Sequence, residues 1–235
     1  MDLDKQKEIN YMLSNRCRLL KIVESIPSNN QNINLLDIGT TPNTFFIKYL
    51  NPEFNVFSID LTNLMADRSR SKGIHFKACD LTKEQIPFEN NYFDIVIFTE
   101  VLEHLFIPPN KVLMEIFRVL KENGILLFSV PNVAKLANRY KLMLGICPFE
   151  NANCQLDDDR VHGCGHIREY TMKEITELLS LNRFQIIRCE YLKTRKFIDN
   201  YDGLVELPKM LLFIYFLLTF LVPSFRSTLY IECSK

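Results

Sequence analysis

The chain has no excess of either charge, because 28 Lys and Arg residues balance 28 Asp and Glu residues over 235 positions. The basic residues are scattered, so the sequence lacks the electrostatic footprint that holds a nucleic-acid backbone. It also lacks internal repeats and linkers rich in proline, glycine or serine. A composition of 47% hydrophobic and 24% charged residues excludes disordered and low-complexity classes. We therefore expect one folded domain over residues 1–235 and no nucleic-acid partner.

An uncharged segment long enough to cross a membrane is also missing. The best candidate, Met210–Phe225, has sixteen residues between Lys209 and Arg226, whereas a spanning helix needs about 20. We expect it to form a helix within an apolar insertion, residues 204–226, before the last strand. If exposed, this helix would touch a membrane, an apolar substrate or a second copy of the chain in a homodimer; otherwise it belongs to the domain's own core.

The seven cysteines are odd in number and widely spaced, and the chain begins with charged residues rather than with a signal-peptide pattern. Such cysteine usage is typical of a reducing compartment rather than of a disulfide framework. We therefore expect a cytoplasmic protein, at the periphery of a membrane if the apolar segment is exposed.

Short β-branched or aromatic runs alternate with amphipathic stretches of helical length, which is typical of a mostly parallel sheet covered by helices. The last two of the seven predicted strands are not joined by a simple crossover helix, so they should form an antiparallel pair at one edge. The fold class is thus α/β, with seven strands, helices on both faces and the last strand antiparallel. The strands are expected at Ile33–Ile38, Phe54–Ile59, Ile74–Ala78, Phe93–Phe98, Ile125–Val130, Phe184–Leu192 and Thr228–Ser234.

Helical periodicity and capping residues place the helices. One helix is expected over Lys5–Ser25, within an N-terminal helical cap formed by residues 1–30. The helix that includes residues 109–121 should end at Asn123-Gly124, and another should begin after Thr171, which forms a capping box with Glu174. The helices between strands are expected at Pro42–Leu50, Asn63–Ser71 and Pro109–Lys121.

Acidic and small residues stand at the carboxyl ends of the first three predicted strands, where ligands of open α/β sheets bind. A glycine there permits close approach of the backbone, and small hydroxyl residues open the next helix. One carboxylate can accept hydrogen bonds from ribose hydroxyls, and another can accept them from an amino group. An apolar residue can pack against a base, so the set suits a nucleoside. Its members are Asp37, Gly39, Thr40 and Thr41 after the first strand, Asp60 after the second, and Asp80 and Leu81 after the third.

The series continues with Phe93-Asp94-Ile95-Val96-Ile97, Glu100-Val101-Leu102-Glu103-His104, Arg118–Leu126 and Ser129-Val130-Pro131-Asn132. In order and spacing it resembles the class I S-adenosylmethionine-dependent methyltransferases, from about Asn34 to the C-terminus. The resemblance implies a Rossmann-like fold, the cofactor S-adenosyl-L-methionine, and cofactor-binding roles for the strand-end set and for Thr99. Taken singly, Asp60 or Asp80 is more often a loop or capping residue than a ligand contact, and Thr99 is explained equally well as a structural residue.

The first motif departs from the family, which usually has two further glycines just after Gly39. This chain has Thr40, Thr41 and Asn43 there. Either the threonine hydroxyls and a helix that begins at Pro42 replace the glycine-rich turn, or cofactor binding has decayed. We favour the replacement, because the downstream carboxylates are all present.

Glu100, Glu103 and His104 follow the fourth predicted strand at i, i+3 and i+4, which share one face of a helix. Two carboxylates and an imidazole form most of a divalent-metal site. With His166, 62 residues after His104, the arrangement is similar to ubiquinone-pathway O-methyltransferases and small-RNA 2′-O-methyltransferases, in which a metal holds vicinal oxygens of the substrate.

That resemblance implies one divalent ion at Glu100, Glu103, His104 and His166, with Mn, Fe, Co or Zn favoured over Mg. The alternative is that the carboxylates solvate a helix start and that His104 or His166 acts as a general base without metal. A zinc cluster of Cys154, His162, Cys164 and His166 is not favoured, because alternating residues point apart in an extended segment. Residues 145–170, and Asn151–Gly165 within them, form either a lid over the substrate or a plain solvated loop.

The sequence thus predicts an enzyme that transfers a methyl group from S-adenosylmethionine to a hydroxyl of a small-molecule, sugar or lipid-linked acceptor. Because the sulfonium is already activated, such an enzyme mainly positions the acceptor and helps to remove its proton. Two alternatives stay open: an S-adenosylmethionine-binding interaction module without catalysis, and a 2′-O-methyltransferase of RNA termini, which the neutral charge disfavours.

Overall fold

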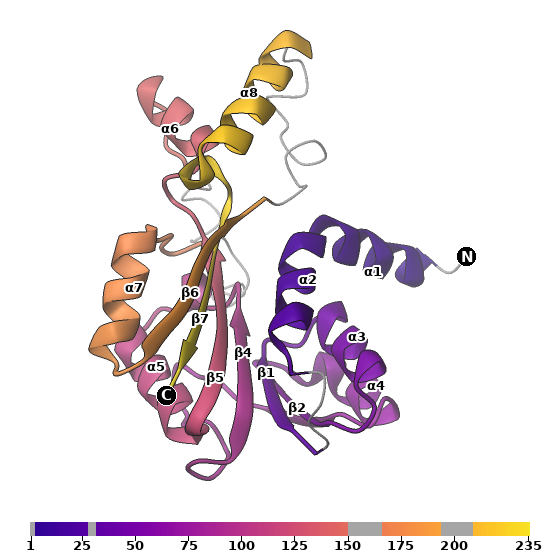
Figure 1. Cartoon of the computed structure of the whole chain (residues 1–235). Helices are drawn as coiled ribbons and strands as arrows, with labels where there is room; N and C mark the ends of the chain where they lie inside the picture. Colours follow the sequence, from indigo (N-terminus) through magenta and orange to yellow (C-terminus); the bar gives the residue numbers. More distant parts are fainter. Residues whose placement is uncertain (1–2, 28–31, 150–165, 194–208) are drawn as a thin grey trace.

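The computed structural model describes residues 3–27, 32–149, 166–193 and 209–235 (Figure 1). Its centre is a seven-stranded sheet in the order β3-β2-β1-β4-β5-β7-β6. The pairs are parallel except those of β7, which runs antiparallel to both β5 and β6. The predicted fold class is therefore confirmed. The strands are β1 Asn34–Ile38, β2 Asn55–Asp60, β3 His75–Ala78, β4 Phe93–Thr99, β5 Leu120–Pro131, β6 Gln185–Leu192 and β7 Thr228–Ser234.

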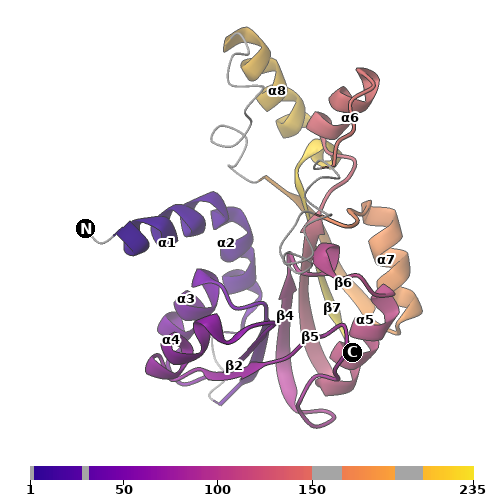
Figure 2. The ribbon, with the colours of Figure 1, turned by 180° about the vertical axis from the view of Figure 1, so that it is seen from behind.

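Helices cover both faces of the sheet, as Figures 1 and 2 show from opposite sides. Successive residues of β1 point to opposite faces, so Leu36 joins one buried cluster and Leu35 the other. The first cluster includes Ile116 of α5, and the second includes Ile22 of α2 and Ile47 of α3. The helices are α1 Leu3–Ser14, α2 Arg16–Ser25, α3 Pro42–Leu50, α4 Ala66–Ser71, α5 Pro109–Val119, α6 Leu136–Met143, α7 Met172–Leu181 and α8 Lys209–Leu221, with short 3-10 turns η1 Asn63–Met65, η2 Leu102–His104 and η6 Pro223–Phe225.

The strand order reverses between β1 and β4, because β2 and β3 lie on one side of β1 and β4 and β5 lie on the other. This reversal is the point at which doubly wound sheets bind ligands, beyond the carboxyl ends of the strands. The residues that follow β1, β2, β3 and β4 therefore meet along one edge of the molecule.

The N-terminal segment forms two helices rather than the single predicted one. Helix α1 stops at Ser14, and Asn15 leaves the helical range with φ −104° and ψ 12°. The Asn15 side chain donates a hydrogen bond to the Tyr11 carbonyl at 2.9 Å, a local alternative to the helical pattern that favours a break. The bend lets α2 pack on the sheet while α1 extends toward α3 (Figure 1).

Two other boundaries differ from expectation. Helix α5 ends at Val119, because Leu120 already pairs with Phe93 in the sheet and is fully buried. Asn123, with φ 64°, and Gly124 therefore kink the inside of a strand instead of ending a helix. The stretch expected as one helix over Asn63–Ser71 begins as the 3-10 turn η1 and continues as α4.

The apolar segment near the C-terminus forms α8, followed by η6, and leads into β7 as predicted. Within the described ranges, no helix combines the length and the apolar character that crossing a membrane requires. Cys154, His162 and Cys164 of the disfavoured zinc cluster, and the segment Asn151–Gly165 interpreted as a lid, lie outside the described residues.

Candidate functional site

The turn after β1 is built around a glycine that no other residue could replace without strain. Gly39 has φ 90°, and a Cβ atom there would lie 2.8 Å from Cγ2 of Val101. The next residues start α3: Thr41 is its N-cap and forms a capping box with Thr44, and Pro42 occupies the first turn. A threonine cap and a proline thus begin the helix at the position where the family usually has further glycines.

Asp37 lies beneath this turn rather than in the open. Its Oδ2 accepts a hydrogen bond of 2.5 Å from the Thr44 hydroxyl. Burial raises the pKa of Asp37 to about 7, although the Thr44 hydrogen bond and the charge of Arg18 oppose the rise. The carboxyl group therefore supports the turn from inside the protein.

A cavity of about 300 Å³ opens at the carboxyl ends of β1 to β4. Glu100 and His104, from the segment after β4, also line it, and its walls include the apolar side chains of Val101 and Leu105. The cavity therefore combines acidic and apolar surfaces, as the sequence predicts for a nucleoside site. Of the residues assigned to the cofactor from the sequence, it is lined by Gly39, Asp60, Asp80 and Leu81, whereas Asp37, Thr40, Thr41 and Thr99 are not among the described residues that line it.

The two cavity-lining aspartates have different surroundings. Asp60 Oδ2 accepts a hydrogen bond from the Thr40 backbone N–H at 2.9 Å, which couples the end of β2 to the turn after β1. Asp80 Oδ1 accepts hydrogen bonds from the backbone and hydroxyl of Thr82, and Oδ2 pairs with Lys83 at 2.8 Å. The Lys83 and Thr82 contacts lower the pKa of Asp80 to about 2. Asp80 is therefore ionised, and it also stabilises its own turn.

Sequence reasoning missed Arg18. This arginine of α2 is only 3% exposed, and its Nη1 lies 3.2 Å from Glu100 Oε1, which also accepts a 2.8 Å hydrogen bond from Ser129. Within the described residues, its Nε has no hydrogen-bond partner. The N-terminal cap thus delivers a buried cation to the turn after β4. The available signal was an arginine beside Leu19 on the apolar, sheet-facing side of its helix.

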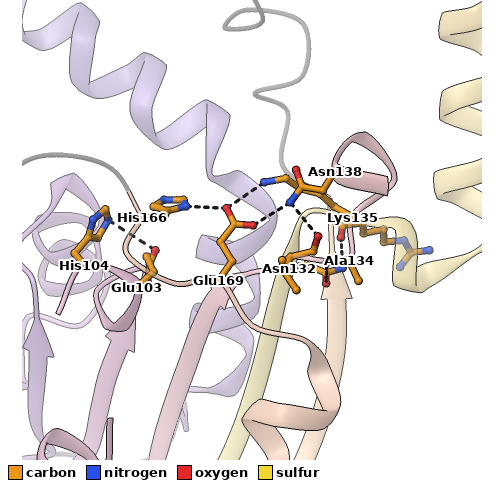
Figure 3. A network of polar contacts seen from close by, with 10 residues as sticks. Glu103, His104, Asn132, Ala134, Lys135, Asn138, His166 and Glu169 are labelled. Carbon is orange, nitrogen blue, oxygen red and sulfur yellow. Dashed lines mark hydrogen bonds and ion pairs between the residues drawn. The ribbon is translucent and has the colours of Figure 1, made fainter. Parts of the chain in front are cut away.

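Glu103, His104 and His166 come together just beyond this cavity (Figure 3). Potential ligand atoms of the three side chains all lie within 4.8 Å of one another. The two imidazole rings meet edge to face, with centroids 5.1 Å apart. Glu103 is 1% exposed, and neither of its carboxylate oxygens has a hydrogen-bond partner among the described residues. Burial, and then the charge of Glu100, raise its pKa well above the usual range.

His166 is oriented by a second carboxylate. Its Nδ1 lies 2.8 Å from Glu169 Oε1, and Glu169 also accepts a hydrogen bond from Asn138 and pairs with Lys135 (Figure 3). Burial alone would raise the pKa of Glu169, but the His166 hydrogen bond and the Lys135 charge outweigh it, so the pKa is lowered. An ionised Glu169 favours the tautomer with the proton on Nδ1, which leaves Nε2 of His166 to accept a proton or bind a cation.

Glu100 does not join this group. The expectation that Glu100, Glu103 and His104 share a helical face is wrong, because Glu100 has φ 55° and only Leu102–His104 form a turn, of 3-10 type. The Glu100 carboxylate turns to Arg18 and Ser129 instead. The cluster therefore offers three side chains rather than the predicted four.

Residues 36–128 match the sequence profile of a family described as "Methyltransferase domain". This match covers 93 of the 235 residues, so it shows a likeness to methyltransferase domains in this part of the chain. No curated protein sequence matches the chain. The profile begins within β1 and ends within β5, so the matched segment contains the residues that line the cavity, Glu103 and His104. Arg18 and His166 lie outside the matched residues.

Solved structures share the fold over nearly the whole chain. An S-adenosylmethionine-dependent methyltransferase from Archaeoglobus fulgidus is 15% identical, covers 96% of this chain and 99% of its own, and has a TM-score of 0.60. The N-methyltransferase NodS from Bradyrhizobium japonicum, in complex with S-adenosyl-L-homocysteine, is 14% identical over 94% and 87% of the two chains, with a TM-score of 0.55. The [4+2]-cyclase SpnF is 18% identical over 93% and 80%, with a TM-score of 0.60. Such likeness shows the fold and leaves the acceptor open.

Proposed function

We propose that this protein transfers the methyl group of S-adenosylmethionine to a hydroxyl group of a small-molecule, sugar or lipid-linked acceptor. The observation that carries the proposal is His104, which lines the cavity at the strand ends and also meets His166 at its edge. A proton-accepting pair of imidazoles beside a methyl-donor site suits a hydroxyl acceptor, because the hydroxyl must lose its proton as the new bond forms.

The cavity residues have complementary tasks toward the donor. Asp60 would accept hydrogen bonds from the ribose hydroxyls, and Asp80 with Leu81 would bind the base through its amino group and its apolar face. Gly39 would allow the backbone to approach the methionine portion of the donor closely.

His166 and His104 would act on the acceptor. Glu169 fixes the tautomer of His166, so Nε2 is available to take the hydroxyl proton, and the charge that develops on the ring is stabilised by that same carboxylate. In-line displacement at the sulfonium then needs mainly alignment of the acceptor oxygen with the methyl group.

A divalent cation fits the same three side chains. The buried carboxylate of Glu103, without a hydrogen-bond partner in the described part of the chain, is an expensive arrangement that a cation would stabilise. Glu103, His104 and His166 would hold the ion, with Glu169 orienting His166 behind it. When bound, the ion supplies Lewis-acid chemistry that favours loss of the acceptor's hydroxyl proton.

Transfer of a labelled methyl group to a panel of phenols, sugars, polyprenyl-linked phenols and amines tests the proposal. We expect label in an O-methyl ether with at least one hydroxylated acceptor and none with the matching compound that lacks the hydroxyl. Labelling of amines alone, or of none of the panel by a protein that binds the donor, would contradict it.

The histidine role is tested with His104→Ala, which should lower turnover about 100-fold or more while donor affinity changes little. His75→Ala is the matched control, because His75 stacks on Phe57 at β3 and does not line the cavity. Loss of activity in chelator and its return with Mn²⁺ would assign the cation to the cluster. Full turnover by metal-free protein in excess chelator would assign the histidines as bases alone.

A further inference from the structure

Two apolar elements project together beyond the carboxyl-end edge of the sheet. They are α6 with the residues that follow it, 136–149, and α8, residues 209–221; we call the pair the apolar prong. Figures 1 and 2 show both standing clear of the sheet from opposite sides. Large apolar side chains on it are exposed: Met143 at 84%, Phe213 at 67% and Phe220 at 66%. Monomeric soluble proteins rarely leave such contiguous apolar surface without a partner.

The two halves of the apolar prong rise from a common base. The Asn132 side chain, at the start of the α6 segment, donates hydrogen bonds to the carbonyls of Ser224 and Arg226, just after α8. The Arg139 guanidinium of α6 lies 5.1 Å from the Phe225 ring. Both halves are therefore fixed to one base and project from the same end of the sheet.

The charges of the apolar prong all have one sign. Neither the segment 135–149 nor the segment 209–226 contains an aspartate or a glutamate, whereas the chain as a whole is neutral. Basic residues stand at the base: Arg139 and Arg226 contact neighbouring backbone carbonyls, and Lys193 lies over the Phe220 ring. Lys141 in the last turn of α6 and Lys209 at the start of α8 are also basic. The purely positive charge beside exposed apolar side chains complements a bilayer surface that carries anionic headgroups.

We propose that the apolar prong seats the protein on the surface of a bilayer that contains anionic lipid. Helix α8 has 13 residues, about 20 Å at 1.5 Å per residue, so it enters the interface without crossing it. A second copy of the chain would cover the apolar tips but would place the cations of one prong against those of the other. A bilayer with anionic headgroups would bury the apolar side chains and also neutralise the basic residues.

This seating places the candidate site at the membrane surface. Asn138 of α6 donates a hydrogen bond to Glu169, and Lys135, just before α6, pairs with the same carboxylate (Figure 3). The base of the prong is thus fastened to the residue that orients His166. Docking would therefore bring an acceptor dissolved in the bilayer directly to the site. Membrane binding itself does not depend on the proposed reaction.

Flotation of the full chain with lipid vesicles tests the proposal without cofactor or acceptor. One set of vesicles contains phosphatidylcholine alone. The other contains phosphatidylcholine with about 30% phosphatidylglycerol, which makes the vesicle surface negative. We expect wild-type protein to float with the anionic vesicles and to bind the neutral ones at least tenfold more weakly. Salt at about 0.5 M should release part of the bound protein, because it shortens the Debye length roughly threefold relative to low salt and so screens the attraction to anionic lipid.

The double variant Met143→Glu with Phe213→Glu should lose at least tenfold in binding to anionic vesicles. Leu181→Glu, an equally exposed leucine of α7 at 81%, is the control and should bind like wild type; circular dichroism checks that all three fold. Equal binding by the double variant, or no binding by wild type, would overturn the proposal. A wild-type dimer in light scattering that the double variant abolishes, without vesicle binding, would assign the prong to self-association instead.

Discussion

The buried carboxyl group of Asp37 should contribute less to the stability of this protein as the pH rises from about 4 to about 7. Burial raises the pKa of Asp37 from 3.8 to about 7, which corresponds to about 4 kcal/mol at roughly 1.4 kcal/mol per pKa unit. The folded state therefore binds a proton more tightly than the unfolded chain. This contribution to stability is complete below pH 4 and is lost progressively as the pH approaches about 7.

The substitution Asp37→Asn removes the titrating group and keeps an oxygen that can accept the hydrogen bond from Thr44. Between pH 4.5 and 7.5, the unfolding free energy of wild type should fall relative to that of the variant by about 3 kcal/mol, the part of the effect that lies within this range. Urea denaturation at both pH values measures the difference. Asp67→Asn is the control, because the Asp67 side chain is fully exposed.

A difference that does not depend on pH would contradict this prediction. If the difference between wild type and Asp37→Asn is the same at both pH values, Asp37 ionises in the folded protein as it does in the unfolded chain. Burial beneath the turn after β1 would then not control its ionisation, and the account of that turn would be wrong.

Two further substitutions test the construction of the site. Gly39→Ala should destabilise the protein by about 1–3 kcal/mol and weaken donor binding, because it adds strain at φ 90° and a Cβ atom 2.8 Å from Val101. Urea denaturation measures the stability and calorimetry measures the donor affinity; if neither changes, the turn is not strained by a Cβ atom. Arg18→Met should cost about 3–5 kcal/mol by leaving Glu100 without its buried cation, and the double variant with Glu100→Gln should recover part of that loss; equal stability of single and double variants would contradict the coupling.

Local signals in the sequence were sufficient for most of the fold. Helix α3 and strand β7 begin and end at the predicted residues, because a capping threonine with proline starts the helix and β-branched and aromatic residues favour the strand. The capping box of Thr171 and Glu174 is likewise confirmed at the start of α7. These features depend on residues close together in the chain, so a single sequence carries them.

The site was less predictable, because its contacts join distant segments. Arg18 meets Glu100 only after α2 packs on the sheet, so nothing near Arg18 in the sequence indicates an ion pair. Glu100 looks like a helical residue by spacing, yet its left-handed backbone sends it away from Glu103. The pairing of His166 with Glu169 lies within one short segment, but its meeting with His104 depends on the tertiary fold.

Calorimetric titration with S-adenosylmethionine tests the central claim, that the strand-end cavity holds the methyl donor. Wild-type protein should bind both S-adenosylmethionine and S-adenosylhomocysteine, and Asp60→Ala should weaken binding by about 1–3 kcal/mol, the cost of leaving polar partners unpaired. Asp67→Ala, at an exposed position away from the cavity, should bind like wild type. Absence of wild-type binding at donor concentrations on the order of 1 mM, which corresponds to about −4 kcal/mol, would contradict the account.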